Sequence, residues 1–276
     1  MASPEEAVLY RTQGRIAIIT LNQPKKLNAM TQPYYYRISC LLRDIAANPD
    51  ISVTVITGSG RFFSAGANVT TTRPGVGPGT DKDAARGDIL RSFVSNNLDI
   101  TRSFYTHPKI LVTALNGPVV GIAAALVACS DFIYCLPHTY LLTPFSSLGL
   151  VAEGASSLML ARRMGVSKAK EALIMSRKIS ADELLACGFD NKVFNLEVGN
   201  TEKFMEQVLQ ELDDRVGPHL NDSSMLHIKS LMSAHFQREV DAQNVAELFR
   251  NLERQVAGIP QKEFEKLRTG KKRHKL

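Results

Sequence analysis

The chain has 276 residues, which is enough for one large domain or two small ones. Hydrophobic residues make up 44% and charged residues 22%, as in ordinary soluble globular proteins, and no apolar stretch approaches the ~18 residues of a membrane-spanning helix. The formal net charge is +6, of which the segment Lys262 to Leu276 carries +5. Such a basic tail suits a solvated helix end, and it also suits attraction to an anionic membrane or a phosphorylated ligand. We expect no nucleic-acid partner, because no nucleic-acid motif is present.

The first part of the chain alternates predicted strands with predicted helices. Runs of β-branched and apolar residues predict strands, and apolar residues at helical spacing predict helices. The predicted order is a strand at Arg15 to Leu21, a helix at Thr31 to Ala47 that Thr31 is expected to cap, a strand at Val53 to Thr57, a Gly/Ser loop at Gly58 to Ala67, a mobile loop at Thr70 to Asp83, a helix at Ala84 to Tyr105 and a buried strand at Lys109 to Leu115.

The remainder of the chain becomes increasingly helical. The same criteria predict a short apolar helix at Gly121 to Ser130, strands at Asp131 to Cys135 and Thr139 to Leu142, helices at Gly154 to Met164, Lys168 to Met175 and Ala181 to Ala186, and a last strand at Lys192 to Asn195. From Thr201 to about Gly258 the pattern is purely helical, with a break at Gly217-Pro218. This order predicts an α/β core over residues 1–200 and a helical region over residues 201–276.

Three segments carry residues suited to proton transfer next to a carbonyl group. SGRFFSAGANV (59–69) gathers small residues around a turn, where backbone N–H groups can approach a developing negative charge. LNGPVVGIAAA (115–125) begins a helix at Gly121, and a helix start offers free N–H groups. In LGLVAEGA (148–155), Glu153 is the only charged residue between Asp131 and Arg162, so we expect desolvation to raise its pKa toward that of a general base. Taken singly, each segment also suits a structural role, as a turn, a helix start or a glutamate in a first helical turn.

The order of these segments resembles the crotonase, or enoyl-CoA hydratase/isomerase, superfamily over roughly residues 7 to 260. QPKKLNAM (23–30) is similar to the family's first CoA-contacting turn, and KISADELLACGFDNKVF (178–194) to its later helix and strand. The resemblance implies an α/β spiral of β/β/α turns with a helical C-terminal trimerisation region, assembled as a homotrimer or hexamer. It implies an oxyanion hole made by the backbone N–H groups of Ala67 and Ile122. It also implies substrate contacts by Ala65, Gly66, Asn68, Val69 and Lys26.

Two positions depart from the pattern of a hydratase. Hydratases of this family place two glutamates around a water molecule, and the alignment puts them at Ala125 and Phe145, which cannot activate water. Family members that shift a double bond carry their carboxylate where Glu153 stands, and the resemblance is closest to the fungal peroxisomal delta-3, delta-2 enoyl-CoA isomerases. Asn68 replaces the usual aspartate at the end of the second turn, which a hole built from a backbone amide tolerates.

The reaction expected from this resemblance needs a single base. Glu153 would move a proton along a 3-enoyl-CoA to give the 2-trans-enoyl-CoA in β-oxidation of unsaturated fatty acids. No metal or redox cofactor is expected, and CoA is part of the substrate. Two alternatives stay open: an isomerase that converts 3,5-dienoyl-CoA to 2,4-dienoyl-CoA, and a catalytically silent binding protein of the same fold.

The C-terminal tripeptide suggests a cellular location. His274, Lys275 and Leu276 resemble the Ser-Lys-Leu address that a soluble import receptor reads for peroxisomes, with His in place of Ser. We therefore expect the protein in the peroxisomal matrix, with that receptor as a partner.

Overall fold

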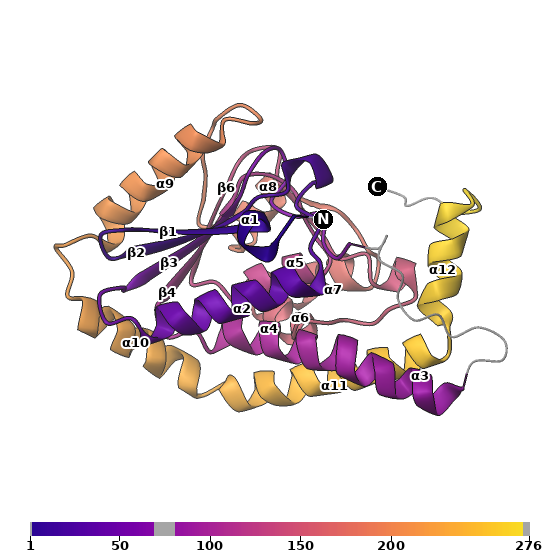
Figure 1. Cartoon of the computed structure of the whole chain (residues 1–276). Helices are drawn as coiled ribbons and strands as arrows, with labels where there is room; N and C mark the ends of the chain where they lie inside the picture. Colours follow the sequence, from indigo (N-terminus) through magenta and orange to yellow (C-terminus); the bar gives the residue numbers. More distant parts are fainter. Residues whose placement is uncertain (1, 69–80, 273–276) are drawn as a thin grey trace.

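A computed structural model describes residues 2–68 and 81–272, and its main sheet runs through the centre of the molecule (Figure 1). Within these residues the sheet has the strand order β1-β2-β3-β4-β6-β9, in which β1 pairs antiparallel with β2 and every other pair is parallel. A smaller sheet has the order β5-β7-β8. The strands are β1 Val8–Gln13, β2 Ile16–Leu21, β3 Val53–Gly58, β4 Ile110–Leu115, β5 Val119–Val120, β6 Phe132–Cys135, β7 Tyr140–Leu142, β8 Ile179–Ser180 and β9 Lys192–Val193.

The predicted strands are confirmed, and three further strands were missed. Every residue of β3 and β4 is buried, as their continuous apolar composition predicts for inner strands of a parallel sheet. β1 was missed because its residues after Val8 are exposed and mostly polar. β5 and β8 have only two residues each, too short to show a periodic pattern.

The helices confirm the predicted order, with shifted bounds. They are α1 Pro4–Ala7, α2 Gln32–Ala47, α3 Lys82–Ile89, α4 Ser95–Tyr105, α5 Ile122–Val127, α6 Ser156–Met164, α7 Val166–Leu173, α8 Ala181–Ala186, α9 Thr201–Val216, α10 Asp222–Ala234, α11 Gln237–Val256 and α12 Ile259–Arg268, with short 3₁₀ turns η1 Pro24–Lys26 and η3 Ser146–Leu148. Thr31 precedes α2, but its side chain makes no capping hydrogen bond, so that prediction was wrong. The C-terminal region breaks at Gly217-Pro218 as expected, and it breaks again before α11 and before α12.

The predicted helix at Ala84 to Tyr105 is interrupted by a π-helical segment, η2 Leu90–Val94. α3, η2 and α4 follow one another without a loop and form one long irregular helix along the lower part of Figure 1. A π-helical segment changes which side chains face a given direction, and such segments are frequent at functional sites. The apolar spacing of the sequence gave no sign of it.

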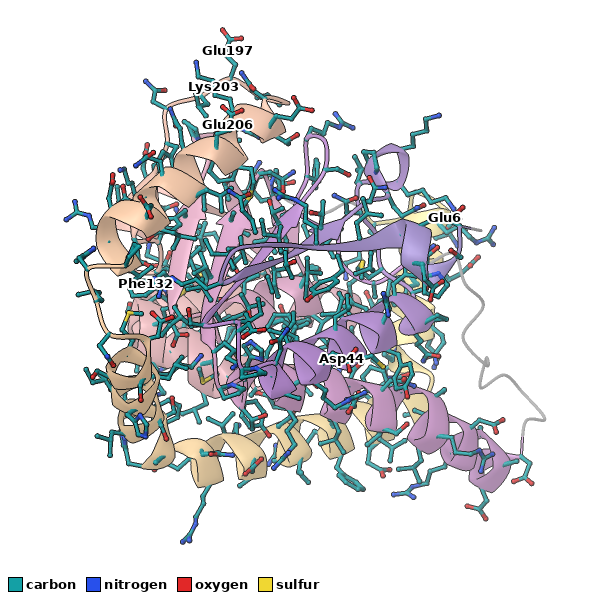
Figure 2. The ribbon with its side chains drawn as sticks, turned by 60° about the vertical axis from the view of Figure 1, so that its left-hand side comes forward. Glu6, Asp44, Phe132, Glu197, Lys203 and Glu206 are labelled. Carbon is teal, nitrogen blue, oxygen red and sulfur yellow. The ribbon has the colours of Figure 1, made fainter. Side chains whose placement is uncertain are left out.

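Two apolar layers cover the two faces of the main sheet. On one face α9 packs Phe204, Val208 and Leu212 against Val55 and Val112. The opposite side of this helix region is polar, and Figure 2 shows the side chains of Glu197, Lys203 and Glu206 projecting away from the sheet. This amphipathic arrangement explains why α9 lies on the sheet surface.

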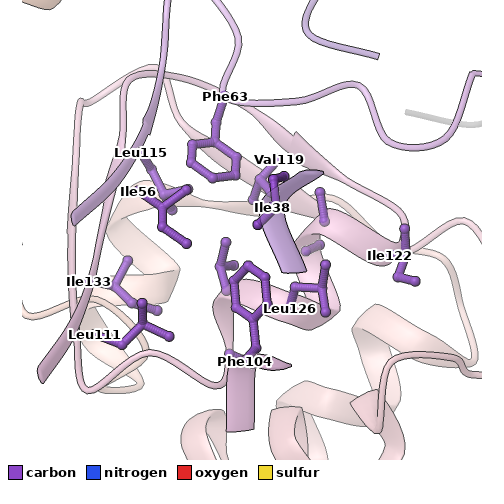
Figure 3. Close-up of a cluster of buried hydrophobic side chains, with 14 of the residues drawn as sticks. Ile38, Ile56, Phe63, Phe104, Leu111, Leu115, Val119, Ile122, Leu126 and Ile133 are labelled. Atoms are coloured by element: carbon purple, nitrogen blue, oxygen red, sulfur yellow. The ribbon is translucent and has the colours of Figure 1, made fainter. Parts of the chain in front are cut away.

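The second layer lies between the main sheet and the helices α2, α4 and α5. Ile38 of α2, Phe104 of α4 and Leu126 of α5 converge there on strand residues such as Leu111 and Ile133 (Figure 3). Ile122 lies at the margin of this cluster. The start of α5 is therefore anchored by apolar packing on one side.

No helix in the described ranges is long and apolar enough to cross a bilayer. The division of the chain at residue 200 and the trimeric or hexameric assembly stay predictions.

Candidate active site

The two glycine-rich segments meet through backbone hydrogen bonds. The N–H groups of Phe63 and Ser64 donate to the carbonyl oxygen of Pro118 at 3.1 and 3.2 Å, and the N–H of Val120 donates to the oxygen of Ser64 at 2.9 Å. Buried Asn116 also accepts from the N–H of Gly58 at 3.0 Å, through its side-chain oxygen. These bonds fix the turn after β3 against the segment that leads into α5.

The N-terminal turn joins the same assembly. The side-chain amide of Asn28, which is fully buried, donates to the carbonyl oxygens of Ser59 and Phe62 at 2.9 and 2.8 Å. Met30 and Ala67 form a parallel bridge, in which the N–H of Met30 donates to Gly66 and the N–H of Asn68 donates to Met30, both at 2.8 Å. This pairing uses the carbonyl oxygen of Gly66 and the N–H of Asn68, which flank Ala67. The N–H of Ala67 therefore points away from Met30.

Gly66 and Gly121 bring the two candidate amide donors together. Gly66 has φ +86°, and a Cβ atom built on it would lie 2.8 Å from the carbonyl oxygen of Val120 and 3.7 Å from the Cα of Gly121. Only glycine permits this approach and this backbone conformation. Ala67 and Ile122 directly follow these two glycines, so their N–H groups start from adjacent positions.

Neither amide is used elsewhere in the described part of the chain. Ile122 is the first residue of α5, and first-turn N–H groups have no partner within their helix. Among the hydrogen bonds of the described residues, none has the N–H of Ala67 or of Ile122 as its donor. Within the described residues, both N–H groups therefore lack a protein acceptor.

Glu153 lies in the loop between η3 and α6 and is buried, with 7% of its surface exposed. The structural interpretation as a first-turn helical residue is wrong, because α6 begins only at Ser156, after Ala155 in a left-handed conformation. Gly154 has φ +73°, and a Cβ on it would lie 2.8 Å from the Cβ of Ala125 and 3.5 Å from Cγ1 of Ile122. The loop thus packs directly on α5, against the side chains of Ala125 and Ile122.

Asn97 is a contact of Glu153 that the sequence analysis missed. Its side-chain amide donates to Oε2 of Glu153 at 3.1 Å, across 56 positions of sequence. Asn97 stands in the first turn of α4, directly after the π-helical segment η2. An amide beside a carboxylate can orient it by a charge-assisted hydrogen bond without competing for the proton that it transfers.

The other predicted substrate contacts divide into three groups. Ala65, Gly66 and Asn68 lie in the turn just described, where the N–H of Ala65 donates to the oxygen of Leu27 at 2.8 Å. Lys26 is exposed in η1, at the edge of the same assembly. Val69, together with His274, Lys275 and Leu276 of the targeting prediction and most of the loop predicted at Thr70 to Asp83, lies outside the described residues.

The two hydratase positions are buried and apolar. Ala125 is fully buried in α5 and Phe145 is 2% exposed. Because Ala125 packs against Gly154, the turn of Glu153 closes over the place where a hydratase would have its first carboxylate. Within the described residues, no group of three or more His, Cys, Asp or Glu side chains is arranged to hold a metal ion.

A comparison with protein families shows to which family the chain belongs. The model described as "Enoyl-CoA hydratase/isomerase" matches residues 11–273, almost the whole sequence. The chain belongs to the enoyl-CoA hydratase/isomerase family. The resemblance seen in the sequence is therefore confirmed, and so is the α/β crotonase fold with helices toward the C-terminus.

Curated relatives of this family match over nearly full length. A Delta(3,5)-Delta(2,4)-dienoyl-CoA isomerase of Pyricularia oryzae is 51% identical, with 98% of each chain covered. The 3,2-trans-enoyl-CoA isomerase of Saccharomyces cerevisiae is 34% identical, covering 98% of this chain and 97% of the relative. A Delta(3,5)-Delta(2,4)-dienoyl-CoA isomerase of the same yeast is 32% identical, with 98% of each covered.

Solved structures of the family share the fold. An enoyl-CoA hydratase/isomerase from Pseudoalteromonas atlantica superposes with a TM-score of 0.81 at 21% identity, covering 98% of this chain and all of that one. An enoyl-CoA hydratase from Bacillus halodurans gives 0.79 at 18% identity, covering 94% and 99%. At these identities the likeness concerns the fold alone.

Proposed function

We propose that the protein is an acyl-CoA isomerase that converts 3-enoyl-CoA to 2-trans-enoyl-CoA, with Glu153 as its single proton carrier. The observation that carries this proposal is one buried carboxylate in a loop that packs on the start of α5, where the first N–H donates to no acceptor within the described residues. The family membership and the name of the 34% identical yeast relative support it.

The proposed mechanism moves one proton and one double bond. The thioester oxygen accepts hydrogen bonds from the N–H groups of Ala67 and Ile122. Glu153 takes a proton from C2, and the electron pair of that C–H bond spreads over a dienolate whose charge rests on the thioester oxygen. Glu153 then returns the proton to C4, which leaves the double bond between C2 and C3. The same carboxylate acts first as base and then as acid.

The surroundings of Glu153 suit this role. Asn97 supports the carboxylate with an amide, so it adds no second acid. The positions of Ala125 and Phe145 offer no group to activate water, so hydration of 2-enoyl-CoA is not expected. The proposed reaction needs no resident metal or redox cofactor, because it only moves a proton and a double bond, using a carboxylate and two amide donors; CoA is part of the substrate.

A second candidate is the conversion of 3,5-dienoyl-CoA to 2,4-dienoyl-CoA. The specific observation in its favour is the name of the 51% identical relative from Pyricularia oryzae. That reaction returns the proton two carbons further along the chain, at C6, so a single fixed carboxylate serves it less readily than the shift from C2 to C4.

The two candidates are separated by assaying both substrates at matched chain lengths. We expect kcat/KM for 3-enoyl-CoA to exceed that for 3,5-dienoyl-CoA, with no detectable 3-hydroxyacyl-CoA from 2-enoyl-CoA. Products are to be separated by chromatography and identified by mass and double-bond position. A higher kcat/KM for the dienoyl substrate would replace the first candidate by the second, and turnover of neither would favour the silent binding protein.

The proposed location of the protein is the peroxisome. A mouse relative that is 29% identical carries the name "Enoyl-CoA delta isomerase 3, peroxisomal", which supports this location. A fluorescent protein fused ahead of the full chain is expected to coincide with a peroxisomal marker in fungal cells. Diffuse fluorescence would contradict this location.

A further inference from the structure

The loop that carries Glu153 is bonded to helix α11 on its N-terminal side through Asn251. This asparagine is fully buried. Its side-chain oxygen accepts from the N–H of Val151 at 2.9 Å, and its side-chain amide donates to the carbonyl oxygens of Val151 and Ala152 at 3.2 and 3.1 Å. One side chain thus fixes the backbone of the two residues that precede Glu153.

The same loop is bonded to α11 on its C-terminal side through Glu247. This side chain is 4% exposed. Its Oε1 accepts from the N–H of Ser157 at 2.8 Å and from the Ser157 hydroxyl at 2.5 Å. Burial raises the pKa of Glu247, and these donors, with the nearby amides of Ala155 and Ser156, act against that rise. Glu153 therefore stands between two anchored stretches of backbone.

The contacts come from one face of α11. Glu247 and Asn251 are four residues apart, the spacing that places side chains one above the other on a helix. Gln243, four residues earlier, donates to the Ser157 hydroxyl oxygen at 2.6 Å, and Arg254 donates to the oxygen of Gly149 at 2.6 Å. This row of polar side chains follows the loop from Gly149 to Ser157.

α11 also packs on the helix that carries Asn97. Leu248 and Leu252 form a small apolar cluster with Ile89, Phe93 and Val94 of α3 and η2. Helix α11 thus contacts both the loop that carries Glu153 and the helix that carries Asn97. A shift of the loop relative to α11 would change the distance between the carboxylate and its amide partner.

We infer that Glu247 and Asn251 are positioning residues, which hold the Glu153 loop at the geometry that proton transfer requires. This inference rests on the proposed function of Glu153. A purely structural role explains part of the pattern, since Glu247 caps the free amides at the start of α6. It does not explain Asn251, whose three bonds go to irregular backbone before the helix and immediately next to Glu153.

The hydrogen bonds of Asn251 and Glu247 serve direction as well as stability. Their partners include backbone groups, and removal of either side chain would leave those groups without this partner, which is unfavourable where they are buried. What the polar pair adds is direction, because each bond fixes a specific backbone group. Catalysis by a fixed carboxylate depends on such placement, and a misplacement of about 1 Å can cost about 100-fold in rate.

The test compares Asn251→Leu with Asn244→Leu in the full-length protein. Asn244 is equally buried on the same helix, and within the described residues its side chain makes no hydrogen bond to the loop that carries Glu153. We expect Asn251→Leu to lower kcat about 10- to 100-fold while KM changes less than about threefold. Asn244→Leu should leave kcat within about twofold of the wild type, whatever its effect on the thermal midpoint.

A second pair of variants tests Glu247 without relying on a change that could unfold the loop. Glu247→Gln keeps an oxygen that can accept from Ser157, whereas Glu247→Ala removes it. We expect the Gln variant to retain most of the kcat and the Ala variant to lose about 10-fold or more. Equal kcat in both variants at the wild-type level would overturn the role of Glu247.

Amide hydrogen exchange supplies a readout that does not depend on activity. Asn251→Leu should raise the exchange rate of residues 150–157 and leave β3 and β4 protected. Unchanged kcat in folded Asn251→Leu, or an equal fall of kcat in Asn244→Leu, would overturn the inference. If wild type and Glu153→Gln are equally inactive on both substrates, the proposed function fails instead. In that case, unchanged exchange in residues 150–157 of Asn251→Leu would by itself reject the positioning role of Asn251.

Discussion

Replacing Glu153 by glutamine is expected to remove nearly all isomerase activity and to leave the fold intact. Glutamine has nearly the same shape, and its oxygen can still accept the hydrogen bond that Asn97 donates at 3.1 Å. It can neither take a proton from C2 nor return one to C4, so both half-reactions lose their acid/base group. We expect kcat to fall about 10²- to 10⁴-fold, the usual contribution of a positioned acid/base residue.

Steady-state kinetics with 3-enoyl-CoA measure this loss, and circular dichroism and the thermal midpoint monitor the fold. Glu206→Gln is the matched control, because Glu206 is exposed on α9 and points away from the sheet (Figure 2). The control should keep the wild-type kcat. Activity near wild type in Glu153→Gln would mean that another group transfers the proton.

Removing the amide hydrogen of Ile122 is the second change with a large expected effect. Ile122→Pro deletes this N–H at the first residue of α5, a position where proline is readily accommodated because no helical hydrogen bond is lost. Loss of one oxyanion donor lowers kcat by about 10²- to 10³-fold. We expect this loss in the proline variant relative to Ile122→Ala.

Ile122→Ala is the necessary reference, since the side chain of Ile122 belongs to the apolar cluster of Figure 3 and its loss alone affects packing. Both variants lose the side chain, and only the proline variant also loses the N–H. The ratio of their kcat values therefore isolates the donor. A ratio near one would remove Ile122 from the proposed oxyanion hole and leave Ala67 as its remaining candidate.

The strands that position the site could be predicted from the sequence because their environment is uniform. β3 and β4 are buried on both faces, and their continuous apolar runs reflect this directly. β1 could not be found in the same way, because an exposed edge strand shows no apolar pattern. The two-residue strands β5 and β8 are defined by their hydrogen bonds to β7 in the smaller sheet, which a local sequence pattern cannot show.

Glu153 was recognisable because a charged residue in an apolar stretch contrasts with its neighbours. Asn97 was not, because an amide in a mostly polar helix is unremarkable in sequence, and the apolar spacing gave no sign of the π-helical segment that precedes it. Glu247 and Asn251 have the same difficulty. Their spacing on α11 is typical of any solvated helix, and only the folded structure shows that this polar row is buried against the loop.

The free amides illustrate a further limit. The sequence indicates a helix start at Gly121 and a turn at Gly66, and both are found. That the two glycines approach each other depends on the bridges between Ser64 and Val119 and between Met30 and Ala67. Such pairing over long sequence separation follows from the fold as a whole.

The most direct test of the account follows one labelled proton through the reaction. A 3-enoyl-CoA carrying deuterium at C2 is converted in ordinary water under single-turnover conditions, and the product is analysed for deuterium at C4. Because Glu153 is 93% shielded from solvent, as its 7% exposure shows, the account predicts that part of the label reaches C4. Product formed at the wild-type rate with only solvent hydrogen at C4 would contradict transfer by one enclosed carboxylate.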